Sequence, residues 1–88
     1  MSEYEQLSVL YNQHYLADEP EQAMAIALEQ LDMDPSDSVA LLRFALSVQG
    51  SCDKVQPFFS QYGANNEFQF VTELAKLVIK KECNIQLD

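Results

Sequence analysis

Apolar residues recur at steps of three and four along most of the chain, which is the spacing of one face of an α-helix. The first such face is formed by Tyr4, Leu7, Leu10, Tyr11, His14 and Tyr15. Ser2 and Glu5, at the start of this face, have the spacing of a capping box, in which each side chain bonds the backbone amide of the other residue. The pattern therefore predicts a helix over residues 3–17.

The same spacing returns in four later segments, which predict helices over residues 20–33, 37–49, 54–62 and 67–82. The sequence Asp18-Glu19-Pro20 favours a helix start, with an acidic cap and a proline in the first turn. The sequence Asp34-Pro35-Ser36-Asp37 ends the second helix and begins the third. The segment 67–82 carries an apolar stripe made of Phe68, Val71, Leu74, Ala75, Val78 and Ile79.

Glycine and capping residues divide the later helices from one another. Gly50 suits the left-handed residue that ends a helix, and Gly63 is placed to close the fourth helix in the same way. Asp53 is expected to cap the fourth helix, and Asn65 or Asn66 the fifth. Five helices joined by turns of a few residues predict an all-α fold of antiparallel helical hairpins. We expect one domain over residues 1–83 and a flexible tail over residues 84–88.

The charge of the chain is concentrated in its first half. The 88 residues carry 14 acids and 5 bases, a net charge of −9. Residues 1–42 hold nine acids and no lysine or arginine, and the remainder is neutral overall. The acidic half is either a solvated face or a patch that steers a basic partner. The balance argues against nucleic-acid binding, which needs clustered cations, and against an anchor on an anionic membrane.

The chain offers few residues for catalysis or metal binding. His14 is the single histidine and is expected to be a packing residue rather than a base, and no second histidine completes a common metal site. Asp32, Asp34 and Asp37 lack the glycine and terminal glutamate of an EF-hand, so we interpret them as caps and turn residues. We expect no enzymatic activity, no metal and no cofactor.

The two cysteines, Cys52 and Cys83, are too few for a disulfide scaffold. They are far apart in sequence, and we expect two reduced thiols in a cytoplasmic protein. Cys52 is placed in a loop, where it is either a reactive thiol or a bystander. The acidic, polar N-terminus is unlike a secretory signal, and no apolar run is long enough to cross a bilayer.

Residues 23–37 resemble the second helix and exit turn of a tetratricopeptide repeat (TPR). That pattern has a small residue, apolar residues four and eight positions later, and an acidic-proline turn. It is carried here by Ala23, Ala27, Leu31 and Asp34-Pro35. Gln30 stands where alanine is usual, and Leu7, Leu10 and Tyr11 occupy the buried stripe of the helix before it.

A second copy of the pattern follows Pro35. Its first helix is carried by Leu41, Phe44, Ala45 and Val48, and its degenerate second helix by Val55 and Phe59. The resemblance covers residues 4–62. It implies about one and a half TPR-like repeats, with the helix over 67–82 as a C-terminal closing helix.

In TPR proteins the first helix of each repeat lines a concave groove. The resemblance implies a partner-binding groove lined by Asn12, Tyr15, Leu16, Val39, Leu42, Leu46 and Gln49, with Glu5 and Ser8 beside them. Most of these residues are apolar or aromatic, so either a partner helix lies on them or the helix over 67–82 covers Tyr15, Leu42 and Leu46 in an ordinary core. The groove lacks the lysines with which some TPR proteins grip acidic chaperone tails.

Size, acidity and an apolar groove make the chain similar to a class of small TPR-like chaperones of bacterial type III secretion. Those chaperones hold the amphipathic helix of the needle subunit, often with a second small helical co-chaperone. We therefore expect a cytoplasmic chaperone or adaptor whose partner is a protein with an amphipathic helix, without nucleic-acid binding or membrane insertion. The alternative is a structural helical subunit of a larger assembly.

Overall fold

A computed structural model describes residues 1–62 and 68–87 of the chain. Those residues form five α-helices and one short 3₁₀ helix, η1, and include no strand, which confirms the all-α fold. The elements are α1 (Glu3–Leu16), α2 (Pro20–Met33), α3 (Ser38–Leu46), η1 (Cys52–Lys54), α4 (Val55–Tyr62) and α5 (Gln69–Cys83). None of the described helices has the length and apolar character that crossing a membrane requires.

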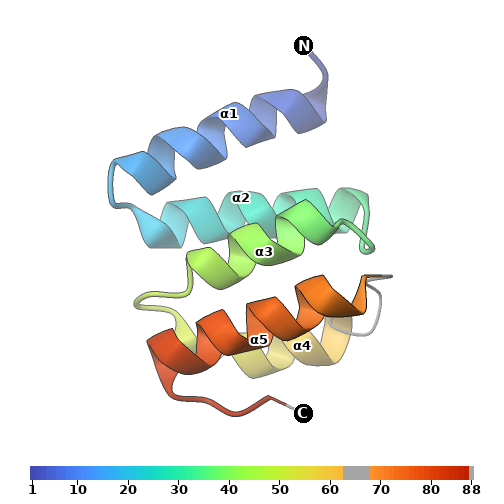
Figure 1. Ribbon diagram of the computed structural model, residues 1–88. Helices are drawn as coiled ribbons and strands as arrows, with labels where there is room; N and C mark the ends of the chain where they lie inside the picture. The colour runs from blue at the N-terminus through green and yellow to red at the C-terminus, as the bar shows by residue number, and fades with distance from the viewer. Residues whose placement is uncertain (63–67, 88) are drawn as a thin grey trace.

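The helices alternate in direction along the chain, so that α1, α3 and α5 run one way while α2 and α4 run the other (Figure 1). The helix α2 packs against both α1 and α3, and α5 packs against α3. The C-terminal ends of α1, α3 and α5 therefore lie on the same side of the molecule. This arrangement places residues from three parallel helices near one another.

Local capping explains where several helices begin. The Ser2 hydroxyl accepts a 3.1 Å hydrogen bond from the Glu5 amide, and the Glu5 carboxylate accepts one of 3.2 Å from the Ser2 amide. This is the predicted capping box. The Asp37 carboxylate accepts a 3.1 Å hydrogen bond from the Ala40 amide and so caps α3. Pro20 occupies the first turn of α2, as its fixed φ favours.

The acidic cap expected before Pro20 is Glu19, but its side chain does not bond the helix, and the cap expected at Asp53 was wrong. Asp18 adopts a left-handed conformation with φ of 58°, and Glu19 is the N-cap of α2 without a side-chain bond to the helix. Asp53 lies inside η1, whose N-cap is Ser51. The expected stop at Gly63 and caps at Asn65 or Asn66 lie outside the described residues.

The helix α3 ends at Leu46, three residues before the predicted end at residue 49. The Ser47 hydroxyl donates to the carbonyls of Arg43 and Phe44, at 2.6 and 3.2 Å, and so competes with the helical bonds that would continue the helix. Gly50 does adopt the left-handed conformation, with φ of 80°, but in the turn beyond the helix end.

The core is built mainly from α2, α3 and α4 and is completed by α5. Its fully or nearly buried side chains are Leu7, Tyr11, Ala23, Met24, Ile26, Ala27, Leu31, Ala40, Leu41, Phe44, Ala45, Val48, Val55, Phe58, Tyr62, Ala75 and Ile79. The rings of Phe44 and Phe58 stack with their centroids 3.6 Å apart, which fixes α4 against α3. Leu10, expected in the buried stripe of the first helix, is instead 43% exposed.

Cys52 and Cys83 form a disulfide, so the prediction of two reduced thiols was wrong. Their Cα atoms lie 5.6 Å apart, although 31 positions separate them in sequence. The pairing arises because α4 and α5 run in opposite directions and return the chain to the start of η1 (Figure 1). The bond ties the C-terminal end of α5 to the loop that follows α3.

The residues after α5 contact the core. Asn84 caps α5 in a left-handed conformation with φ of 56°, and its amide donates a 2.8 Å bond to the Lys80 carbonyl. Ile85 and Leu87 are partly buried against the core. These three residues belong to the segment 84–88 that was expected to be a flexible tail, and Asp88 lies outside the described residues.

Candidate functional site

A polar network around the buried side chain of Gln30 joins α1, α2 and α3. The Arg43 guanidinium donates hydrogen bonds to the Gln30 side-chain oxygen at 2.9 Å and to the Ser8 hydroxyl at 3.0 Å. The Gln30 amide nitrogen donates to the same hydroxyl at 3.0 Å and to the Tyr4 carbonyl at 3.3 Å. Gln30 is fully buried and therefore needs partners within the protein, and this network supplies them to both its oxygen and its nitrogen. The network explains how a glutamine is accommodated at this buried position.

Tyr11 and Arg43 reinforce the contact between α1 and α3. The Tyr11 hydroxyl donates a 2.8 Å bond to the Arg43 carbonyl, and the guanidinium carbon lies 5.3 Å from the centre of the Tyr11 ring. Burial raises the pKa of the Tyr11 hydroxyl, so it keeps its proton, and remains a donor, further into the alkaline range. Tyr15 stacks on Tyr11 with ring centroids 5.8 Å apart, so its ring is held in place although it faces solvent.

A second contact fixes the first turn of α1. The Tyr4 hydroxyl donates a 2.6 Å hydrogen bond to the Asp37 carboxylate, which also caps α3. Burial and the Asp37 carboxylate, which favours the protonated phenol, together raise the pKa of Tyr4 to about 12. The bonds of Tyr4 and Tyr11 therefore join the first turn and the middle of α1 to the two ends of α3.

The predicted binding residues lie on α1, on α3 and in the turn after α3, and most of them face solvent. Exposed fractions are 44% for Tyr15, 83% for Leu16, 53% for Val39 and 45% for Leu46. Asn12 and Gln49 are also exposed, and Leu42 is partly buried. Tyr15 and Leu46 thus lie outside the core, because α5 packs beside α3 without covering them. We call Asn12, Tyr15, Leu16, Val39, Leu42, Leu46 and Gln49 the candidate face.

Three residues of the candidate face meet in one hollow of about 290 Å³. Its lining residues are Tyr15, Asp18, Pro20, Leu46, Gln49 and Glu82, and we call it the α1–α3–α5 hollow. Asn12, Leu16, Val39 and Leu42 do not line it. The sequence pattern missed Asp18 and Glu82, because neither belongs to a TPR groove position and Glu82 comes from a helix that was assigned to closing the fold.

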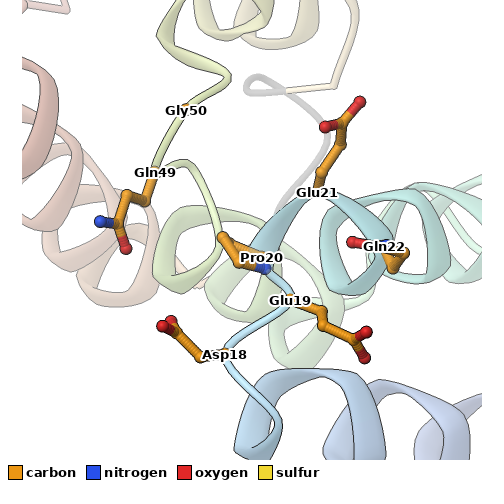
Figure 2. Close-up of a pocket in the computed structure, with 7 residues that line it drawn as sticks. All are labelled: Asp18, Glu19, Pro20, Glu21, Gln22, Gln49 and Gly50. Carbon is orange, nitrogen blue, oxygen red and sulfur yellow. The ribbon is translucent and has the colours of Figure 1, made fainter.

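A larger hollow of about 500 Å³ lies beside the first, at the turn between α1 and α2 (Figure 2). It is lined by Asp18, Glu19, Pro20, Glu21, Gln22, Gln49 and Gly50, with three carboxylates and no basic side chain. The Glu19 carboxylate lies 2.9 Å from the ring nitrogen Nδ1 of His14. His14 therefore has a local structural partner, consistent with its expected role in packing.

The helix α5 carries an exposed apolar stripe that the sequence analysis did not single out. Phe70 is 76% exposed and Leu77 is 65% exposed, and Leu74 lies between them on the same side of the helix. The signal was present as spacings of four and three residues from Phe70 to Leu74 and Leu77. A second stripe, which includes Ala75 and Ile79, faces the core. The spacing of this buried stripe was the stronger signal, so the exposed residues were not recognised as a stripe of their own.

The described residues contain no group of three or more histidine, cysteine or acidic side chains that could hold a metal ion. No family model matches the chain, and the searches of curated proteins and of solved structures found no significant match. The resemblance to a TPR therefore stays a prediction from residues 4–62.

Proposed function

We propose that this protein is a small adaptor or chaperone that binds an amphipathic helix of a partner protein on the candidate face. The observation that carries the proposal is the exposure of Tyr15, Val39 and Leu46 on two helices that are fixed to each other. Clustered exposed apolar side chains in a small protein are typical of an interaction surface. A helix that inserts its apolar side chains between two neighbouring helices would cover them.

The rigidity of the two helices supports this function. Arg43 bonds Ser8 and Gln30, and Tyr4 bonds Asp37. These bonds connect α1 to α3 in the protein without a bound partner. A preformed surface loses little conformational entropy on binding, so more of the contact energy appears as affinity. Tyr15, whose ring already stacks on Tyr11, would serve as an aromatic anchor of the kind that dominates interface energies.

We further propose that the partner is a secretion substrate of the needle-subunit type, in line with the resemblance to type III secretion chaperones. This finer proposal is supported by the small size, the net charge of −9 and the TPR-like residues 23–37. A cytoplasmic location would go with it. The Cys52–Cys83 disulfide favours an oxidising compartment instead, because cytosolic thiols are kept reduced. In the cytoplasm the same pair would exist as two thiols.

A second candidate function is that of a structural helical subunit, and the exposed stripe of Phe70 and Leu77 favours it. A permanent subunit would bury this stripe together with the candidate face. The two functions differ in the fate of the complex. A chaperone releases its client before the client assembles, whereas a structural subunit stays in the mature assembly.

The proposal is tested with an array of synthetic amphipathic helices that share one apolar face and differ in their polar faces. We expect a subset of them to bind the wild-type protein and to lose about thirtyfold or more in affinity towards Leu46→Asp, equivalent to roughly 2 kcal/mol. Leu10→Asp is the matched control, because Leu10 is 43% exposed against 45% for Leu46 and lies outside the candidate face. Equal loss in both variants, or binding by none of the helices, would contradict the proposal.

A further inference from the structure

The α1–α3–α5 hollow combines an apolar wall with two carboxylates. Tyr15 and Leu46 provide the wall, and Asp18 and Glu82 bring carboxylates from the α1–α2 turn and from the end of α5. The Gln49 side chain adds an amide at the rim. A ligand that fits this lining has a hydrocarbon part and a cationic end.

Neither carboxylate forms an ion pair within residues 1–62 and 68–87. The ion pairs in the described part of the chain join His14 to Glu19 and Lys76 to Glu73, which leaves Asp18 and Glu82 without a cationic partner there. Figure 2 shows the Asp18 side chain directed away from that of Glu19 and towards the side of Gln49. The left-handed backbone of Asp18, with φ of 58°, sets this direction at the turn into α2.

The helix dipoles add to the negative potential of the hollow. Tyr15, Leu46 and Glu82 lie in the last turns of α1, α3 and α5, whose C-terminal ends carry partial negative charge. The N-terminal end of α2 at Pro20 and the nearby Lys81 on α5 act in the opposite sense. The lining itself contains two acids and no base, so its own side chains favour a cation.

We propose that this hollow receives a lysine or arginine side chain of the partner helix, an inference that rests on the proposed function. The alkyl stem of that side chain lies against Leu46 and the Tyr15 ring, and its charged end lies between Asp18 and Glu82. Long basic side chains bury their stems while the charge stays near water, and an exposed tyrosine ring attracts a cation to its face. The partner is therefore a basic amphipathic helix.

The site also sets the position of the partner along α3. A helix that places its cation in the hollow has its apolar residues over Leu42 and Val39, towards the N-terminal end of α3. The acidic first half of the chain, with nine acids and no base in residues 1–42, would speed the approach of such a helix. Steering of this kind acts through the whole acidic surface, whereas the site acts through Asp18 and Glu82 alone.

The test uses two synthetic amphipathic helices of about 18 residues, or five turns, with the same leucine and alanine face. One carries a single lysine near one end, and its sibling has glutamine at that position. Fluorescence anisotropy measures their affinities for the wild-type protein, for Asp18→Asn with Glu82→Gln, and for two control variants. Asparagine tolerates the left-handed backbone of residue 18, so the double variant keeps the turn.

The first control is Glu29→Gln, on α2, at a position that does not line the hollow. The second control is Glu29→Gln with Asp53→Asn, which removes two negative charges, as many as the double variant does, from positions outside the lining of the hollow. We expect the Kd of the lysine helix for the wild type to be about tenfold lower than that of the glutamine helix. That advantage should fall below about twofold in the double variant and persist in both controls. Backbone amide shifts in an NMR titration should change at Leu46, Gln49 and Glu82.

The outcomes separate this inference from the proposed function. Equal binding of the two helices to the wild type would overturn the cation site and leave the apolar face supported. Equal loss of the lysine advantage in the double variant and in the doubly substituted control would assign the effect to overall charge, which also overturns the site. No binding by either helix would overturn both.

Discussion

The Arg43 guanidinium on α3 donates a 2.9 Å hydrogen bond to the side-chain oxygen of Gln30, a residue of α2 with no exposed surface. The same guanidinium reaches Ser8 on α1, so one side chain links three helices. A glutamine in an otherwise apolar helix face is costly unless both ends of its amide are bonded. Here both ends of the Gln30 amide are bonded, and these bonds connect the two helices, α1 and α3, that carry most of the candidate face.

Gln30→Ala should lower the free energy of unfolding by about 2 to 3 kcal/mol, because it leaves Arg43 and Ser8 short of a partner and opens a void. Urea denaturation followed by circular dichroism measures the change. The adjacent exposed position provides the control, and Glu29→Ala should stay within about 0.5 kcal/mol of the wild type. Equal stability of the two variants would show that the network contributes nothing.

Phe44→Asp should prevent folding, because Phe44 is fully buried against Phe58 and a carboxylate there would have no partner. Leu46→Asp should cost less than about 1 kcal/mol, most of it from an acid at a helix C-terminus. Thermal melts of the two variants measure the contrast. A collapse of both would mean that Leu46 supports the core and that the candidate face is not a free surface.

Reduction of the Cys52–Cys83 bond should destabilise the protein by about 3 to 4 kcal/mol, the value expected from closing a loop of 31 residues in the unfolded chain. Melting curves with and without dithiothreitol measure the shift. The double variant Cys52→Ser with Cys83→Ser should have the melting temperature of the reduced protein, and dithiothreitol should not change it. Identical curves for the oxidised and reduced wild type would contradict a stabilising role.

Stability should fall in alkaline solution through Tyr4. Its pKa is raised to about 12 by burial and by Asp37, whereas an unfolded tyrosine titrates near 10. The unfolded state therefore loses the proton first, so the contribution is complete below pH 10 and is lost as the pH rises towards 12. Burial raises the pKa of Tyr11, and the bond to Asp32 raises that of Tyr62, so both act in the same direction.

Urea midpoints measured between about pH 8 and pH 12 test this dependence. Tyr4→Phe should lose stability less steeply over that range, because phenylalanine has no proton to release. Asp37→Asn should also flatten the curve, since removing the carboxylate lowers the pKa of Tyr4 towards its ordinary value. An unchanged alkaline slope in both variants would rule out Tyr4 as a main cause.

The sequence by itself determined the helical class and most of the helix starts. The Ser2–Glu5 capping box, the Asp37 cap and Pro20 in the first turn all act within four residues of the helix they begin, so local sequence contains the whole interaction. The C-terminal end of α3 was harder to predict from the sequence. Gly50 and Ser47 both offer a stop, and only the folded chain shows that the Ser47 hydroxyl bonds the carbonyls that precede it.

The tertiary structure decided every contact between distant segments. The Cys52–Cys83 pair, the Arg43–Gln30 bond and the meeting of Leu46 with Glu82 all depend on which helices run side by side. Helical periodicity gives the face of each helix but not its neighbour, because an apolar stripe can pack against any other stripe of similar length. Only the packing of the whole chain determined which stripe of α5 faces the core. The same packing left Phe70 and Leu77, on the other stripe, exposed to solvent.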